Sequence, residues 1–275
     1  EPNNDKFAYA SFGYAAEELD ALENSEVKNG SDEVMKRIYE LGKKINEAGV
    51  YEELLTLLDI DEFTNYMAVT LFLHNDDWPD NNIKCYRSQN DGRFRFVSFD
   101  LDYAFKACWP NNSKDNPFDN FAMFKDNKTA PRTSKNIDFV NFFLNLLNHD
   151  GYRKKFIDTF CLVAGSVFEP TRSNKIVDEL HNKVKSMCQM MKQLGINDGH
   201  DPDRAVSTIK NNLKGRSKKM TDYLQKYSQM NLKNVTRQEV TLSADTEGAS
   251  LFVNGIEVPY ADFNGHLFAP VTLEA

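Results

Sequence analysis

Short polar side chains gather in two segments of the chain, 74–82 and 98–102. Within them Asp77 precedes Asn82 by five residues, and Asp100 follows in the second segment. Carboxylate and amide oxygens are the hard ligands that Mg²⁺ or Mn²⁺ prefers. A further carboxylate outside the metal shell can orient a hydroxyl nucleophile. These residue types therefore predict a divalent metal site beside a group that handles a hydroxyl.

A predicted β-hairpin positions these side chains. Ile83–Arg87 and Arg93–Phe99 alternate like strands, and an Asp-Gly pair between them supplies the residues that a tight turn requires. With the turn there, Asn82 at the start of the first strand faces Asp100 at the end of the second. Antiparallel partners lie roughly 5 Å apart, so we expect both at the open end of the hairpin. The loop that carries Asp77 reaches the same end.

The spacing of these residues is that of a protein-kinase catalytic site. An aspartate five residues before an asparagine, followed by a metal-holding aspartate on a hairpin, matches Asp77, Asn82 and Asp100. The spacing also occurs by chance, so a polar loop that only caps a helix stays open. Asp100 and Asp102 also match the Asp-x-Asp of a metal-dependent glycosyltransferase or a phosphatase, which are less favoured alternatives. Both of those folds require alternating strands and helices upstream, where this chain is predicted to be helical.

Two runs carry a resemblance to a known family. They are N-D-D-W-P-D-N-N-I-K-C-Y-R at 75–87 and G-R-F-R-F-V-S-F-D-L-D-Y-A-F at 92–105. Together they closely resemble the signature of the spore-coat protein H (CotH) kinase family, which is similar to secreted or lumenal atypical protein kinases.

The resemblance implies roles for individual residues. Asp77 falls on the family's catalytic aspartate, and Asn82 and Asp100 fall on metal-facing positions. Asp102 matches the second acidic residue of the Asp-Leu-Asp run, so metal binding there stays open. The implied reaction is phosphoryl transfer from ATP, with Mg²⁺ or Mn²⁺, to Ser/Thr of a protein substrate. The implied location is extracellular or at the cell surface.

The chain also departs from ordinary kinases. It has no H-R-D or D-F-G string, which suits the atypical family, and we find no glycine-rich loop and no V-A-I-K-like lysine strand. The 76 residues before Asp77 are predicted to be helical. We therefore expect the C-terminal lobe of a kinase whose nucleotide-cradling N-terminal lobe is missing. Whether the isolated chain binds ATP stays open.

The fold class expected is mainly α with an internal β-hairpin, an α+β arrangement like a kinase C-lobe. A nearly all-apolar helix from Asp61 to Leu73 is expected in the middle of the domain, with Asp61 as its cap. The other predicted helices are Ser31–Ala48, Val50–Leu58, Asn136–Leu147, Tyr152–Val163, Ser173–Leu194 and Asp203–Gln229.

Composition changes near Val235, where helix formers give way to Val, Thr, Gly and Phe. We therefore expect a helical domain over 1–235 and a short β-appendix or truncated β-sandwich over 236–275. Its strands are predicted to turn at Asn254-Gly255 and Asn264-Gly265.

Charge and composition exclude some functions. The 41 acidic and 33 basic side chains give a net charge of −8, so no basic surplus is available for nucleic-acid phosphates. No run of about 18 apolar residues exists to span a membrane.

The competing hypothesis is a non-catalytic extracellular or surface module that binds a protein or glycan. His74 is interpreted as helix capping rather than a metal ligand, Trp78 as cover for a core edge, and Met187, Met190 and Met191 as packing.

Overall fold

The computed structural model describes Ala10 and residues 13–75, 77–90, 92–106, 116–119, 121, 133–196, 202–246 and 248–275. It separates into two compact units, one of Glu1–Ala104 with Ser113–Ile157 and the other of Phe105–Asn112 with Asp158–Ala275. Neither unit ends near Val235, and a domain boundary at that residue stays a prediction.

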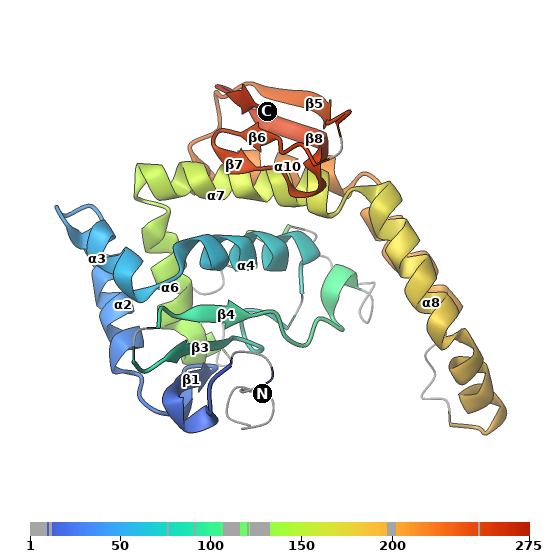
Figure 1. Ribbon diagram of the computed structural model, residues 1–275, viewed down its shortest axis with the longest axis horizontal. Helices are drawn as coiled ribbons and strands as arrows, with labels where there is room; N and C mark the ends of the chain where they lie inside the picture. The colour runs from blue at the N-terminus through green and yellow to red at the C-terminus, as the bar shows by residue number, and fades with distance from the viewer. Residues whose placement is uncertain are drawn as a thin grey trace. The chain divides into compact units, whose positions relative to one another are not determined.

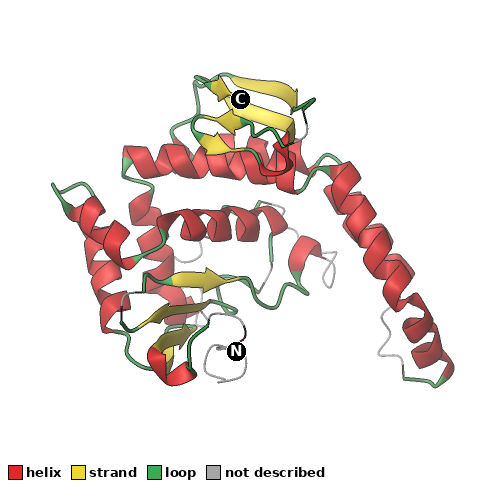
Figure 2. Ribbon diagram, viewed as in Figure 1, coloured by secondary structure: helices red, strands yellow, loops and turns green. Residues whose placement is uncertain are grey.

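The first unit combines helices with a four-stranded antiparallel sheet of order β2-β1-β3-β4 (Figure 1). The strands are β1 Leu19–Glu23, β2 Glu26–Asn29, β3 Lys84–Ser88 and β4 Arg95–Val97. The helices are α2 Glu33–Lys43, α3 Val50–Leu57, α4 Ile60–Leu73, α6 Ile137–Leu146 and the first part of α7 Asp150–Leu162. The fold is mainly helical with small antiparallel sheets, as predicted (Figure 2).

Strands β1 and β2 correct the expectation that everything before Asp77 is helical. They form a hairpin around Asn24 and Ser25, whose φ values of 50° and 64° are those of a tight two-residue turn. β1 then pairs along its whole length with β3, with Glu23 opposite Lys84. The predicted hairpin is therefore part of a larger sheet. Pairing with β1 fixes the position of β3, the strand that follows the polar loop.

The predicted β3–β4 hairpin is confirmed with shorter strands. Lys84 pairs with Val97 and Cys85 with Phe96. Continuing this register by two positions puts Asn82 opposite Phe99, the residue before Asp100. The two polar residues therefore meet diagonally at the open end of the hairpin rather than face to face.

Helix α4 lies in the core of the first unit, as its nearly all-apolar sequence predicts. Phe63 is fully buried, with ring centroids 5.0 Å from Phe96, 5.6 Å from Phe142 and 6.1 Å from Phe139. These rings join the helix to β4 and α6. The predicted N-cap is wrong: the cap is Asp59, whose Oδ1 accepts a hydrogen bond from the Glu62 backbone N–H at 3.4 Å.

The second unit holds the later helices and the C-terminal strands. Its main elements are α8 Pro170–Gln193, α9 Pro202–Leu213, α10 Arg216–Lys226, β5 Arg237–Ser243, β6 Phe252–Val253, β7 Ile256–Glu257, β8 Asp262–Phe268 and β9 Leu273–Glu274. The single helix predicted over Asp203–Gln229 is broken at Gly215, whose φ of 69° leaves the helical region. A glycine inside a helical pattern marks the end of one helix here.

The two Asn-Gly pairs of the β-segment behave differently. Asn254-Gly255 forms the predicted turn between β6 and β7, with both residues at positive φ. Asn264-Gly265 is not a turn, because both residues lie inside β8. A Cβ on Gly265 would lie 3.0 Å from the Gly165 Cα. The absence of a side chain at Gly265 therefore allows two backbone segments to approach closely, which is a second role of glycine in strands.

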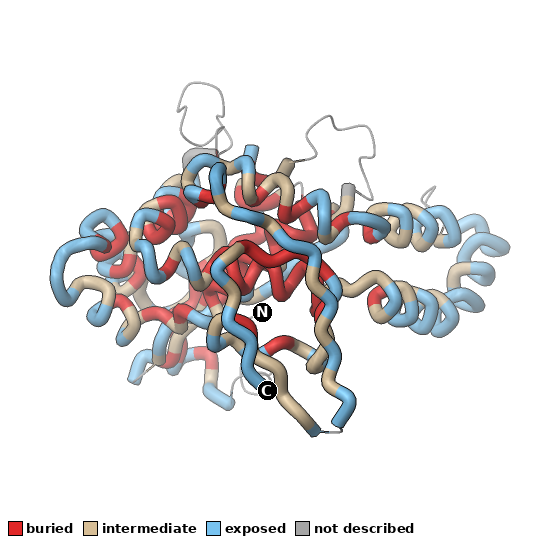
Figure 3. The backbone as a smooth tube through the Cα atoms, turned by 90° about the horizontal axis from the view of Figure 1, so that it is seen from above, coloured by how far each residue is buried: buried red, intermediate tan, exposed pale blue. Residues whose placement is uncertain are grey.

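Helix α8 buries little of its surface, although its methionines are predicted as packing residues. Lys210 forms an ion pair with Asp178, and the His181 Nε2 lies 3.0 Å from Asp203 Oδ1, so both contacts connect α8 to α9. Along this helix the backbone is coloured mostly as exposed or intermediate (Figure 3). Eight large apolar residues between 176 and 196 are exposed: Ile176, Leu180, Val184, Met187, Met190, Met191, Leu194 and Ile196. The packing assignment is wrong within the part of the chain that the structure describes.

Candidate functional site

The candidate site begins where α4 ends. The backbone N–H of His74 donates to the carbonyls of Thr70 and Leu71, and its φ of 50° turns the chain out of the helix. His74 and Asn75 are both buried. The predicted capping position of His74 is therefore correct, and the loop after it leaves the core from a fixed point.

Asn75 connects this loop to the end of the hairpin. Its side-chain Oδ1 accepts from the Asp77 backbone N–H at 3.2 Å, and its Nδ2 donates to the Asp100 carbonyl at 2.9 Å. One amide therefore sets the separation between the two predicted aspartates, which lie 23 positions apart in the chain.

Trp78 anchors the loop to the core of the first unit. Its ring is buried and lies edge-on to Phe121 and Phe139, while its Nε1 donates to the Tyr66 hydroxyl at 3.1 Å. The prediction that Trp78 covers a core edge is confirmed, because the ring belongs to the core of the first unit. Asp77, the preceding residue, remains only half-buried.

The structure brings Asp77, Asn82 and Asp100 together. The Asn82 Nδ2 donates to Asp77 Oδ2 at 3.1 Å and lies 3.5 Å from the Asp100 carbonyl oxygen. Asn81 donates to the same Asp77 oxygen at 3.2 Å. Because Nδ2 of Asn82 is engaged in this way, Oδ1 is the atom that it could offer to a cation.

The backbone at both predicted metal positions is unusual. Asn82 has φ 62° and Asp100 has φ 51°, both in the left-handed region that side chains other than glycine rarely adopt. Asn and Asp tolerate this region better than other residues, and such conformations gather at functional sites. The chain turns sharply just before the first strand of the hairpin and just after the second, and this brings the two residues together at its open end.

Asp100 and Asp102 form a pair of like-charged groups at the exposed edge of the site. A hydrogen bond with Asp102, together with the charges of Asp102 and Asp77, raises the pKa of Asp100 above its ordinary value, and Lys84 opposes that shift. Carboxylates that crowd together in this way are what a divalent cation stabilises.

The residues present fit the oxygen-ligand preference of Mg²⁺ or Mn²⁺. Asp100, Asn82 and Asp102 can offer oxygens, and Asp77 lies beside them. Among the residues that the structure describes, no group of three or more His, Cys, Asp or Glu side chains has the arrangement of a metal site. An amide ligand such as Asn82 lies outside that set of residue types, so the assignment of metal ligands stays a prediction.

Sequence reasoning missed a network of asparagines that supports the loop. Asn136 is fully buried, and its Nδ2 donates to the carbonyls of Pro79 at 3.0 Å and Asp80 at 3.2 Å. Asn24 donates to Asn81 Oδ1 at 2.6 Å. Asn24 belongs to the unpredicted β1–β2 turn, so these contacts could not be anticipated without that hairpin.

Sequence reasoning also missed a buried ion pair beside the site, Lys84 with Glu23. The Lys84 Nζ lies 3.3 Å from Glu23 Oε1, and its side chain is 4% exposed. The available signal was a lysine within a strand whose neighbours Ile83 and Cys85 are apolar. Lysine is rarely buried unless it is paired.

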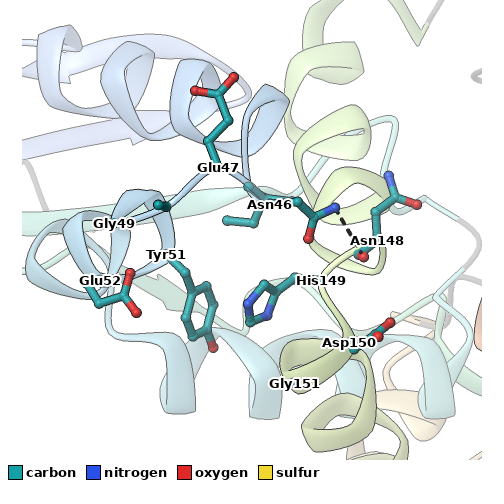
Figure 4. A pocket seen from close by; sticks show the side chains of 11 residues that line it. Asn46, Glu47, Gly49, Tyr51, Glu52, Asn148, His149, Asp150 and Gly151 are labelled. Atoms are coloured by element: carbon teal, nitrogen blue, oxygen red, sulfur yellow. Dashed lines mark hydrogen bonds between the residues drawn. The ribbon is translucent and has the colours of Figure 1, made fainter.

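A cavity elsewhere in the first unit is distinct from this site. It has a volume of about 490 Å³ and lies at the start of α3 and of α7. The rings of Tyr51 and His149 stack there, with their centroids 4.1 Å apart (Figure 4). Its acidic residues stand at helix N-termini, where they offset the helix dipole, and Asp150 pairs with Arg153. None of the predicted site residues lines it.

The fold and the site together define a mainly helical protein with an Asp-Asn-Asp cluster at the open end of a β-hairpin. The family model described as CotH kinase protein matches residues 6–230. This match covers more than half of the chain, so the chain belongs to the CotH kinase family, as the sequence resemblance indicates. Neither the curated proteins nor the solved structures provide a match.

Across the described ranges, no helix is both long enough and apolar enough to cross a membrane.

Proposed function

We propose that this chain transfers the terminal phosphoryl group of ATP to Ser or Thr hydroxyls of a protein substrate, with a divalent metal. The observation that carries the proposal is the convergence of Asp77, Asn82 and Asp100, in which one amide group lies within hydrogen-bonding distance of both aspartates. Membership of a kinase family agrees with it. An extracellular or cell-surface location stays a prediction from the resemblance.

Asp77 is proposed to handle the substrate hydroxyl. The amides of Asn81 and Asn82 both donate to Oδ2, which fixes the orientation of the carboxylate. Oδ1 is then the oxygen that accepts the proton of the serine or threonine hydroxyl as that hydroxyl attacks phosphorus and ADP leaves. A carboxylate held by two donors is ready for the reaction before the substrate arrives.

Asn82 and Asp100 are proposed to hold Mg²⁺ or Mn²⁺, with Asp102 as a further acidic residue beside them. The metal, when bound with ATP, would neutralise negative charge on the phosphoryl groups. The protein's own contribution is to place these oxygens together, through the left-handed backbone at Asn82 and Asp100 and through the Asn75 bridge. Phosphoryl transfer depends mainly on such positioning and charge neutralisation.

A radiolabel-transfer assay with Mn²⁺ and ATP on a Ser/Thr-rich protein tests the proposal. Asp77→Asn should lower the initial rate by about a hundredfold or more, because it removes the proton acceptor. Asp32→Asn, the same chemical change on a half-buried residue at the start of α2, should leave the rate unchanged. Equal rates for Asp77→Asn and wild type would exclude Asp77 as the base. A wild type without transfer or nucleotide binding would favour the competing protein- or glycan-binding module.

A further inference from the structure

Lys84 occupies an unusual position for a lysine. It begins β3, directly opposite Glu23 of β1, and its Nζ lies 3.3 Å from Glu23 Oε1. Its side chain is almost fully buried. Burying an ammonium group costs free energy that an ion pair only partly returns. A shorter apolar residue would fill a strand position at no such cost, so the charge itself needs an explanation.

The lysine does not belong to the core under the sheet. Neighbouring side chains on a strand point to opposite faces, and Cys85 pairs with Phe96 on the face that packs against α4. Lys84 and Glu23 therefore share the opposite face. This face adjoins Phe99 and Asp100, which follow β4.

Phe99 keeps the ammonium at the edge of the site. The Lys84 Nζ lies 3.4 Å from the centre of the Phe99 ring, a cation–π contact, and the ring itself is partly exposed. Asp100 is the next residue, and the charge of Lys84 acts on it. A movement of one exposed aromatic ring would bring the ammonium into contact with a ligand at Asp100.

The ion pairs that start at Lys84 form a series along the edge of the sheet. Glu23 is shared with Lys28 at 3.8 Å, Lys28 contacts Glu26 at 3.2 Å, and Glu26 contacts Lys135 at 3.2 Å. The series alternates in sign and both begins and ends with a lysine, so three cations face two carboxylates. On the other side, Asp77, Asp100 and Asp102 would repel a polyphosphate unless cations offset them.

We propose that Lys84, positioned by Glu23, binds the phosphate oxygens of a metal-bound polyphosphate and so acts as the phosphate-binding lysine of this chain. The inference rests on the proposed function for the site. Ordinary kinases carry a phosphate-binding lysine on a separate strand, which this sequence does not show. Lys84, on the hairpin itself, would take its place. An ammonium on a rigid strand can neutralise phosphate charge without recruiting a mobile side chain.

Calorimetric titration with Mn²⁺ alone and with Mn²⁺ plus inorganic tripolyphosphate tests this role. Lys84→Met should weaken tripolyphosphate binding about tenfold or more, as loss of one phosphate-contacting cation does. The same variant should bind free Mn²⁺ at least as tightly as wild type, because a positive charge near the carboxylates is gone. A purely structural lysine would change both titrations together or neither.

The same sheet offers a matched control. Arg87 pairs with Asp20 at 2.8 Å, and both are largely buried, so Arg87→Met removes a comparable ion pair farther along β3. It should leave both titrations unchanged. If Lys84→Met does not fold, the double variant Lys84→Gln with Glu23→Gln, which leaves no lone buried charge, should show the same loss of tripolyphosphate binding.

The outcomes separate the inference from the proposed function. Tripolyphosphate binding that depends on Lys84, without phosphoryl transfer to protein, would support the lysine's role and overturn the kinase proposal. Phosphoryl transfer that is unchanged in Lys84→Met would do the reverse. Wild type that binds Mn²⁺ but no tripolyphosphate, or variants that bind it as tightly as wild type, would overturn the role of Lys84.

Discussion

The carboxylates of Asp59 and Asp100 lie near opposite ends of helix α4, and their surroundings shift their pKa values in opposite directions. At its N-terminus, Asp59 accepts hydrogen bonds from the Glu62 backbone and from Arg95 Nε at 3.0 Å, and Arg93 lies 3.7 Å away. Partial burial acts to raise the pKa of Asp59, but the hydrogen bonds from Arg95 and the backbone outweigh it and lower the pKa. The charge at this end is matched by its surroundings.

At the C-terminal end the carboxylates lie beside one another. A hydrogen bond with Asp102, which forms when Asp100 is protonated, raises the pKa of Asp100, and the negative charges of Asp102 and Asp77 raise it further. This arrangement does not favour the folded state by itself. Crowded like charges are typical of functional sites, which are often held together at a cost in stability. The charge of Asp59 is therefore compensated by its neighbours, whereas the charge of Asp100 is opposed by them.

Glu62, in the first turn of the same helix, is an exception to this comparison, and we expect it to give the largest effect on stability. Burial raises its pKa to about 7, although its carboxylate accepts from the Phe96 backbone at 2.9 Å. The folded state then holds a proton that the unfolded state has lost, so stability falls as pH rises from about 4.5 to 7. Glu62→Gln should remove that slope and stabilise the protein by about 2 kcal/mol at pH 8.

Urea denaturation at pH 5 and pH 8 measures the effect of Glu62→Gln. Glu40→Gln, an exposed carboxylate on α2, should leave the pH dependence of wild type intact. A slope that persists in Glu62→Gln would assign the pH dependence to other groups.

Asp59→Ala should have the next largest effect, a loss of about 1–2 kcal/mol at pH 7, because the helix loses its N-cap together with an arginine contact. Asp61→Ala provides the control, since Asp61 is the predicted cap and pairs with the partly exposed Lys155. It should cost about 0.5 kcal/mol or less. Thermal unfolding of both variants decides which aspartate caps the helix, and an equal loss in both would contradict the assignment.

Asp102→Asn should have the smallest effect, and of opposite sign. Removing one of the crowded charges should stabilise the folded protein by a few tenths of a kcal/mol at pH 7, as surface-charge changes do. The same change should weaken Mn²⁺ binding. A destabilisation of about 1 kcal/mol would instead mark Asp102 as a structural residue, and unchanged Mn²⁺ affinity would remove it from the site.

The sequence predicts the polar site better than the sheet that holds it. Asp77, Asn82 and Asp100 converge as expected because an alternating hairpin and an Asp-Gly turn constrain the chain locally. The hairpin of β1 and β2 escaped prediction since its strands are short and its turn is Asn24-Ser25 rather than Asn-Gly. The Lys84–Glu23 pair depends on that hairpin, so it could not be found either.

Other errors come from contacts between segments far apart in the chain. A glycine that permits a turn and a glycine that permits close packing have the same local sequence. Gly265 is buried against Gly165, 100 residues earlier in the sequence, and no local pattern distinguishes it from Gly255. Propensity and periodicity are local signals, whereas tertiary packing decides between their possible meanings.

The exposed face of α8 also affects the redox chemistry of the chain. Met187, Met190 and Met191 are exposed, whereas Met35 and Met67 are buried in the first unit. Oxidation to the sulfoxide makes a methionine polar, which is more damaging in a core than on an exposed helix surface. We therefore expect oxidation of the three exposed methionines to leave the fold intact while the exposed face of α8 becomes more polar.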